Sequence, residues 1–216
     1  MVFSPSRRQV VGGVALSLAA SGSGWAADRM RWDAVVTRAP RHSSGAPVYD
    51  ALSSAIKAAP LRGERPFRIL VTQGIWDEQI VVDRPFIHLI GEARSASVIH
   101  HVAASGMAAP DGRTWGTFRT PTVFVRAPNF RAENLTIVNA FDGLAEMSRP
   151  GGLHSHDGGG PQAVALMMDK GSDHAHVKDC DILSYQDTLF PDAGASLFEN
   201  CLVTGSYDFI FGAGRA

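Results

Sequence analysis

Short apolar runs separated by turn residues fill the chain from residue 67 to residue 211. The runs are rich in Val, Ile, Phe and Thr, which favour β-strands, and segments such as Gln-Gly, Asp-Arg-Pro and Pro-Asp-Ala-Gly divide them. The pattern predicts strands at 67–71, 79–82, 86–91, 97–101, 122–125, 133–139, 163–168, 180–183, 187–190, 197–203 and 208–211. We therefore expect an all-β domain.

One helical pattern precedes these runs. Over 47–60, apolar residues recur at helical spacing and Pro60 ends the pattern. The apolar positions are Val48, Leu52, Ala55, Ile56 and Ala59. We expect one short helix here and no other of comparable clarity after residue 27.

An internal repeat indicates how the strands are arranged. The segment HVKDCDILSYQDTLF (176–190) matches SLFENCLVTGSYDFIF (196–211) after a shift of 21 residues. The shift aligns Asp187 with Asp208. The segment AENLTIVN (132–139) fits the same register at a distance of 45 residues, which we interpret as two coils of a repeating fold.

Two all-β architectures compete. A sandwich or barrel favours hairpins with two-residue turns such as Asn-Gly, whereas a parallel β-helix repeats at about 20 residues, one coil per repeat. The aligned units favour a right-handed parallel β-helix, capped at its N-terminal end by the helix at 47–60. Its interior column would consist of Leu135, Cys180 and Cys201, and a shared turn position of Asn134, Asp179 and Asn200.

Cys180 and Cys201 lie one coil apart in this arrangement. Neighbouring strands are about 4.8 Å apart, which is compatible with a disulfide. Two alternatives stay open: a disulfide, in an exported protein, or two thiols stacked in the core.

The first 27 residues predict a secretory signal. Arg7 and Arg8 precede the apolar run 10–20, and small residues follow it. The stretch SRRQVV is similar to twin-arginine signals, and the apolar run is shorter than the roughly 20 residues of a membrane span. The alternative is an ordinary amphipathic helix. We expect a signal peptide at 1–27, export to the periplasm or the medium, and one domain over 28–216.

Composition excludes several classes of protein. The chain has 216 residues, 19% of them charged, and a net charge of -1. It therefore has no basic field that would attract nucleic acid. A mean hydropathy of -0.01 excludes a polytopic membrane protein. A length of this size is enough for one domain with a sizeable core.

The repeated aspartates are the first candidates for chemistry. Residues one coil apart are neighbours on one face, so the carboxylates of Asp187 and Asp208 would lie about 4–7 Å apart. Two like charges this close raise one pKa, which gives a general acid beside a base or nucleophile. The alternative is that both are solvated strand residues, although apolar residues flank each of them.

Four segments carry a resemblance to a known family. GIWDE (74–78), GPQAVAL (160–166), YQDTLF (185–190) and DFIFG (208–212) are similar, in order and spacing, to signature segments of the pectin methylesterases, carbohydrate esterase family 8. The resemblance covers about residues 47–214. It implies a right-handed parallel β-helix that hydrolyses methyl esters of polygalacturonate, the backbone of pectin, and releases methanol.

The resemblance also implies roles for matching residues. Asp208 corresponds to the nucleophile, and Asp187 to the acid that protonates methanol and then activates water. Gln162 and Gln186 correspond to the amides that stabilise the oxyanion. Gln162 has an alternative as a turn amide after Gly-Pro.

Three further residues match substrate-binding positions of the family, and the same analysis argues against a metal. The substrate-binding matches are Thr117, Phe190 and Phe211, with core packing as the alternative for the two aromatic residues. We expect no metal and no cofactor, because no carboxylate or Cys cluster accompanies His154, His156, His174 and His176.

The chain departs from the family pattern near its end. The family has a later Leu-Gly-Arg-Pro-Trp segment whose arginine orients the nucleophile, and Arg215 does not match it. We therefore expect a partial domain that lacks C-terminal coils, inactive and prone to aggregate by itself, and a monomer when complete. The rival interpretations are another β-helix enzyme acting on polysaccharides and a non-catalytic β-helix that binds carbohydrate.

Overall fold

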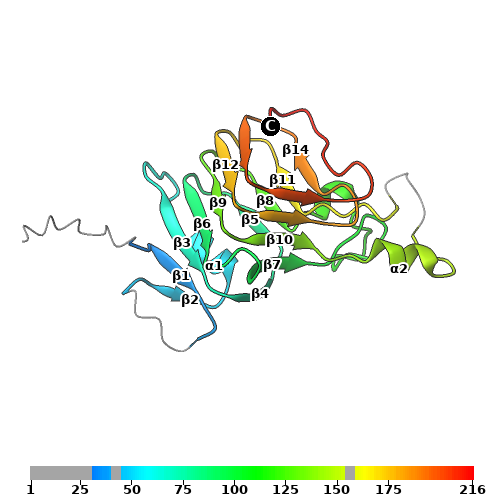
Figure 1. Ribbon diagram of the computed structural model, residues 1–216, viewed down its shortest axis with the longest axis horizontal. Coiled ribbons are helices and arrows are strands. Elements are labelled where there is room, and N and C mark those ends of the chain that lie inside the picture. Colours follow the sequence, from blue (N-terminus) through cyan, green and yellow to red (C-terminus); the bar gives the residue numbers. More distant parts are fainter. Residues whose placement is uncertain (1–30, 40–44, 154–158) are drawn as a thin grey trace, which may run out of the picture. The chain divides into compact units, whose positions relative to one another are not determined.

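A computed structural model describes residues 31–39, 45–153 and 159–216 (Figure 1). The predicted signal peptide at 1–27 lies outside this part, and so do His154 and His156. Within the described residues, no helix has both the length and the apolar character needed to cross a membrane.

The strands form three parallel sheets, and the chain visits the sheets in turn (Figure 1). The first sheet contains β2 (Val48–Tyr49), β1 (Ala34–Val36), β3 (Phe67–Val71), β6 (Ile87–Gly91), β9 (Arg131–Glu133), β12 (Ala175–Lys178) and β15 (Ser196–Glu199). The second contains β4 (Gly74–Asp77), β7 (Ser97–His101), β10 (Thr136–Asn139), β13 (Asp181–Leu183) and β16 (Leu202–Thr204). The third contains β5 (Ile80–Val82), β8 (Val123–Val125), β11 (Leu166–Met168) and β14 (Leu189–Pro191). From β3 onward, consecutive strands therefore lie in different sheets, as in a parallel β-helix.

Residues one coil apart stack in columns, as the repeat predicts. Ile137 pairs with Ile182, which pairs with Val203. Leu135 and Cys180 are fully buried, and Cys201 packs against the same core. The interior column is therefore confirmed, and both cysteines are free thiols in this structure.

A column of turns bends the chain between the first and second sheets. Asn134, Asp179 and Asn200 have φ values of 56°, 52° and 51°, a left-handed conformation that Asn and Asp adopt more easily than most residues. The Asn200 amide donates a hydrogen bond to the Asp179 carboxylate. These turns divide each of the predicted strands 133–139 and 197–203 into two strands.

The same column carries a long cross-link. Arg94, in the turn after β6, donates hydrogen bonds to the Asp181 carboxylate at 2.8 Å and to the main-chain oxygens of Cys180 and Asn200, both at 3.0 Å. Its own main-chain oxygen accepts a hydrogen bond from the Thr136 hydroxyl at 2.7 Å. One residue thus contacts the turns of three later coils.

The interval of 45 residues corresponds to one coil, so the expectation of two coils was wrong. β10 pairs directly with β13, and the extra residues form an insertion at 140–165 between β10 and β11. A second insertion, 102–122, separates β7 from β8. The sequence pattern gave no sign of either, because insertions leave the register of the strands unchanged.

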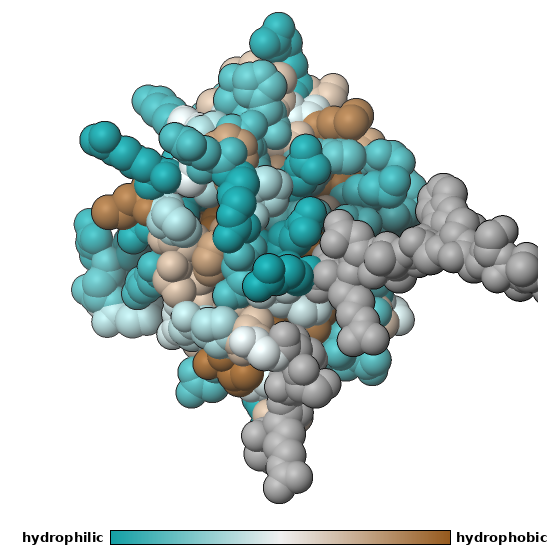
Figure 2. Space-filling view, turned by 90° about the vertical axis from the view of Figure 1, so that its left-hand side faces the viewer, coloured by the Kyte–Doolittle hydropathy of each residue, from teal (hydrophilic) through white to brown (hydrophobic). Residues whose placement is uncertain are grey.

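The N-terminal end is closed by a shorter helix than expected. Residues 48 and 49 form β2, which pairs with β1, and α1 covers only Leu52–Lys57. Leu52, Ala55 and Ile56 are buried against the core, so the predicted cap is confirmed. The side of the molecule on which β1 and β2 lie in Figure 1 is largely hydrophilic, with small hydrophobic areas (Figure 2).

Two smaller elements were not predicted. The insertion at 140–165 contains α2 (Gly143–Ser148), whose first turn is capped by the Asp142 carboxylate. The insertion at 102–122 contains a short 3-10 helix, Thr117–Arg119.

Candidate active site

The two repeated aspartates occupy equivalent turns just before the third sheet. Asp187 and Asp208 have φ values of 56° and 43°. The main-chain amide of Asp187 donates a hydrogen bond to the main-chain oxygen of Tyr207 at 3.0 Å, and that of Leu189 donates one to the main-chain oxygen of Phe209 at 2.9 Å. The two turns are therefore stacked one coil apart, in the predicted register. The expected strands 187–190 and 208–211 begin only after the aspartates: β14 starts at Leu189, and Ile210 forms a single bridge to it.

Backbone strain marks both positions. Non-glycine residues with positive φ cost about 1–3 kcal/mol when the conformation is unfavourable, and such residues cluster at functional sites. Each aspartate forms a left-handed turn directly before the third sheet. Asp187 therefore precedes β14, and Asp208 precedes the bridge at Ile210, so neither lies within a strand.

Asp187 is a buried carboxyl group with a perturbed pKa. Its exposed fraction is 7%. Burial raises the pKa of Asp187 to about 6, a hydrogen bond from Gln186 opposes this rise, and the charge of Asp208 adds to it. The predicted rise in one pKa thus has burial as its main cause, and repulsion between the two carboxylates contributes less.

Gln186 is held against this carboxyl group. Its amide nitrogen donates to Asp187 Oδ1 at 3.0 Å, and the side chain is 4% exposed. An amide NH₂ group has two hydrogens, so one N–H of Gln186 is used in this bond.

A cavity of about 330 Å³ brings the predicted residues together. Its lining consists of Thr117, Phe118, Gln162, Gln186, Asp187, Tyr207, Asp208 and Phe211. Phe118 and Tyr207 were missed by the sequence analysis. The repeat could have identified Tyr207, because Tyr207 aligns with Gln186 after a shift of 21 residues. It could not have identified Phe118, which lies in an insertion without a repeated pattern.

Stacked aromatic rings form one wall of the cavity. The rings of Phe190 and Phe211 lie 4.4 Å apart at 9°, and Phe118 approaches Phe190 at 5.2 Å. Phe190 is 7% exposed and packs with Phe124 and Met167. It therefore supports Phe211 from behind, and it is not among the residues that line the cavity.

The insertions bring two of the residues to the site. Thr117 begins the 3-10 helix in the first insertion. Gln162 lies near the end of the second insertion, where its main-chain oxygen accepts a hydrogen bond from the Ser105 amide at 2.9 Å. The two insertions therefore contact each other beside the cavity.

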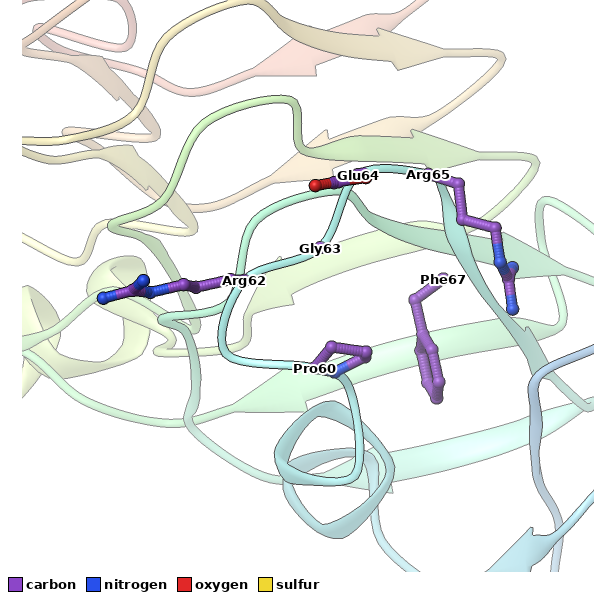
Figure 3. Close-up of a pocket in the computed structure, with 6 residues that line it drawn as sticks. All are labelled: Pro60, Arg62, Gly63, Glu64, Arg65 and Phe67. Carbon is purple, nitrogen blue, oxygen red and sulfur yellow. The ribbon is translucent and has the colours of Figure 1, made fainter.

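A second hollow, of about 260 Å³, lies near the N-terminal end and lacks such chemistry. It is lined by Pro60, Arg62, Gly63, Glu64, Arg65 and Phe67 (Figure 3). Arg65 is engaged by Asp33 through two hydrogen bonds, at 2.7 and 3.1 Å. None of the predicted site residues lies there.

Metal-binding side chains do not gather in the part of the chain that the structure describes: no group of three or more His, Cys, Asp or Glu is arranged to hold an ion. His174 lies beside Asp173 at 3.2 Å, and His176 beside Glu199 at 3.2 Å. Neither of these histidines lines the cavity.

Comparisons with known proteins point to one family. The family model described as Pectinesterase matches residues 35–216. Pectinesterase A of Dickeya dadantii is 37% identical over 97% of this chain and 56% of the relative, and probable pectinesterase 49 of Arabidopsis thaliana is 33% identical over 81% and 44%.

Solved structures agree. The pectin methylesterase of Erwinia chrysanthemi matches with a TM-score of 0.74 and 37% identity, over 85% of this chain and 52% of that one. The pectin methylesterase of Yersinia enterocolitica matches with a TM-score of 0.71 and 39% identity, over 77% and 52%. Pectin methylesterase structures are right-handed parallel β-helices, which confirms the predicted fold.

The chain spans about half the length of the curated relatives it matches. The match nevertheless begins at β1 and includes every strand of the three sheets. With the stacked aspartates and the coils that carry them all inside the matched region, the chain belongs to the pectinesterase family.

Proposed function

We propose that the protein hydrolyses the methyl esters of polygalacturonate in pectin and releases methanol. The observation that carries the proposal is the buried Asp187, with its raised pKa, stacked one coil from Asp208 in a cavity that also holds two glutamine side chains. Relatives named pectinesterases, and a solved pectin methylesterase in complex with a hexasaccharide, support it.

The first step forms an acyl-enzyme. A carboxylate oxygen of Asp208 attacks the ester carbonyl carbon, and the carbonyl oxygen becomes an oxyanion. As the tetrahedral intermediate collapses, the bond to the methoxy oxygen breaks. Asp187, which burial keeps protonated up to about pH 6 by raising its pKa, donates its proton to that oxygen, so methanol departs. The product is an anhydride between Asp208 and the sugar carboxyl group.

The second step regenerates both carboxyl groups. Asp187, now a carboxylate, accepts a proton from a water molecule, whose oxygen attacks the sugar carbonyl of the anhydride. The bond to Asp208 breaks, which releases the sugar as a free acid and returns Asp208 to a carboxylate. Asp187 ends the cycle protonated, and no cofactor is consumed.

Gln162 and Gln186 stabilise the oxyanion in both steps. Both side chains are less than 10% exposed and both line the cavity. The bond from Gln186 to Asp187 occupies one N–H and fixes the amide plane, which leaves its second N–H for the oxyanion. Donors fixed in advance in a site sheltered from water need little reorganisation during the reaction.

The wall of Phe118 and Phe211 suits the substrate. Sugar rings present apolar C–H faces, and the stacked arrangement holds Phe211 rigidly against Phe190. Thr117 lines the same cavity, which supports its role in contacting the sugar.

We also propose that residues 1–27 direct export and that the remaining chain belongs to the pectinesterase domain. Pectin is an extracellular polymer, so an enzyme that acts on it must leave the cytoplasm. Arg7 and Arg8 before an apolar run support this proposal.

Methanol release from highly methylated pectin, measured on a full-length pectinesterase domain that contains this chain, tests the function. Asp208→Asn and Asp187→Asn should reduce it to near background, and Gln162→Ala by about two to three powers of ten. Asp192→Asn is the matched control, because Asp192 follows β14 whereas Asp187 precedes it, and it does not line the cavity. Full activity in Asp208→Asn would refute the assigned nucleophile.

Analysis of the other products separates the rival functions. An esterase leaves the length of the polysaccharide unchanged. New reducing ends without methanol would indicate a hydrolase that cleaves the chain, and binding without any product would indicate a carbohydrate-binding protein.

A further inference from the structure

A buried asparagine joins the two insertions that reach the active site. Asn139 is the last residue of β10 and is 1% exposed. Its amide nitrogen lies within hydrogen-bonding distance of the main-chain oxygens of Ala103 at 2.9 Å, Val164 at 3.0 Å and Thr120 at 3.2 Å. Its oxygen accepts hydrogen bonds from the amides of Ala103 and Phe141, both at 3.3 Å.

The partners of Asn139 mark the ends of both insertions. Ala103 and Thr120 lie near the beginning and the end of the insertion at 102–122. Phe141 and Val164 hold the corresponding places in the insertion at 140–165. One side chain therefore fixes all four points at which the insertions leave and rejoin the β-helix.

Thr120 extends this connection to the active site. Its hydroxyl donates to the main-chain oxygen of Thr117 at 2.7 Å and accepts from the amide of Val164 at 3.0 Å. Thr117 lines the cavity, and Gln162, two residues before Val164, lines it as well. The path from Asn139 to each of these residues is thus a short series of hydrogen bonds, followed in the case of Gln162 by two residues of the backbone.

We infer that Asn139, together with Thr120, is a positioning residue that sets the placement of Gln162 and Thr117 relative to Asp187. This inference rests on the proposed function, in which Gln162 stabilises the oxyanion and Thr117 contacts the sugar. Asn139 does not line the cavity and acts only through the insertions. Displacements of about 1 Å can cost about 100-fold in rate, so the register of the insertions matters to the reaction.

The side chain at this position must be an amide. Three carbonyl oxygens and two amide N–H groups surround it, so it has to donate and accept at once. By contrast, Ser97 in β7 is equally buried, and its hydroxyl donates to the main-chain oxygen of Val71, the last residue of β3, within the β-helix body. Ser97 thus offers a control for burial without a connection to the insertions.

Two matched pairs of variants test the inference in the full chain. Thr120→Val removes the hydroxyl that joins the insertions, whereas Thr122→Val removes a buried hydroxyl that donates to Val138 of β10. We expect kcat on methylated pectin to fall about tenfold or more in Thr120→Val and to stay within twofold in Thr122→Val. Likewise, Asn139→Ala should lower kcat by about 10–100-fold, and Ser97→Ala should not, at a temperature where all variants are folded by circular dichroism.

A double-mutant cycle shows whether the effect passes through Gln162. In the Gln162→Ala background, Thr120→Val should lower kcat much less than it does in the unaltered protein, because the donor that it displaces is already absent. Equal effects in both backgrounds would overturn the inference that Thr120 sets the placement of Gln162. The pH dependence of kcat should not change, since Asp187 and Gln186 belong to the turn before β14.

Hydrogen exchange gives a readout that does not need catalysis. The Val164 amide donates a hydrogen bond to the Thr120 hydroxyl, and the Ser105 amide donates one to the main-chain oxygen of Gln162. Neither amide donates to Asn139 itself. In Asn139→Ala their protection should fall at least tenfold, while that of Leu166 in β11 should be retained. Loss of protection without any esterase activity in the unaltered protein would refute the proposed function but not the placement role. Unchanged protection at Val164 and Ser105 would refute the placement role itself.

Discussion

Replacing Asp187 by Asn should stabilise the folded protein while it abolishes the proposed activity. The carboxyl group has a pKa of about 6 in the folded state, against its usual value of 3.8. A raised pKa means that the folded state binds a proton more tightly than the unfolded state. Stability is therefore greatest below pH 3.8 and decreases as the pH rises through about 6. The introduced amide has no proton to lose and avoids this decrease.

The size of the effect follows from the two pKa values. Each pKa unit corresponds to about 1.4 kcal/mol, so Asp187→Asn should raise the free energy of unfolding by about 3 kcal/mol at pH 8. The gain should be about half as large at pH 5 and close to zero below pH 4. The oxygen of the introduced amide can still accept the hydrogen bond from Gln186, so little packing is lost.

Urea unfolding at several pH values measures this gain. The comparison at low pH is the internal control, because there the carboxyl group is protonated in both states. A gain that is the same at every pH would show that packing, not charge, is responsible. A variant that is less stable at pH 8 would refute the conclusion that the buried carboxylate costs stability.

Three further predictions test other parts of the molecule. Since Asp187 must be protonated to release methanol, kcat/KM on pectin should fall about tenfold per pH unit above about pH 6, and a flat profile to pH 8 would exclude it as the acid. A Cβ on Gly143 would come within 2.0 Å of the Tyr185 ring, so Gly143→Ala should lower the free energy of unfolding by about 1–3 kcal/mol in urea titrations, whereas Gly159→Ala, which meets open space, should change it little. Replacing Arg7 and Arg8 together by Lys should leave uncleaved precursor in the cytoplasm in cell fractionation, and unchanged export would exclude the twin-arginine route.

The strand columns were predictable because the fold repeats. Each coil must place an apolar residue inward at the same point, which makes Leu135, Cys180 and Cys201 recognisable as one column. Each coil must also turn at the same point, and the left-handed turn selects Asn or Asp. The same physical requirement therefore recurs in the sequence once in each coil, where it can be recognised.

The shape of the site was less accessible. Insertions obey no repeat, so Phe118 could not be located from the pattern, and the interval of 45 residues was divided into two coils. The left-handed turn at Asp187 is held by the next coil, in which the main-chain oxygen of Tyr207 accepts a hydrogen bond from the Asp187 amide. Similarly, β2 replaced the first turn of the predicted helix because β1 offered residues 48 and 49 a pairing partner.

The cross-link made by Arg94 has a consequence for how the β-helix loses its structure. In a stack of coils, each coil contacts only its neighbours, so a β-helix can open one coil at a time from either end. Arg94 binds Asp181, Cys180 and Asn200 at once, although β9 and β10 lie between its own coil and theirs. The coils of β12–β13 and β15–β16 therefore cannot open without releasing the guanidinium group of Arg94, whose main-chain oxygen also accepts a hydrogen bond from Thr136 in the coil between. These two coils should therefore unfold cooperatively instead of one at a time. They are also the coils that carry Asp187 and Asp208.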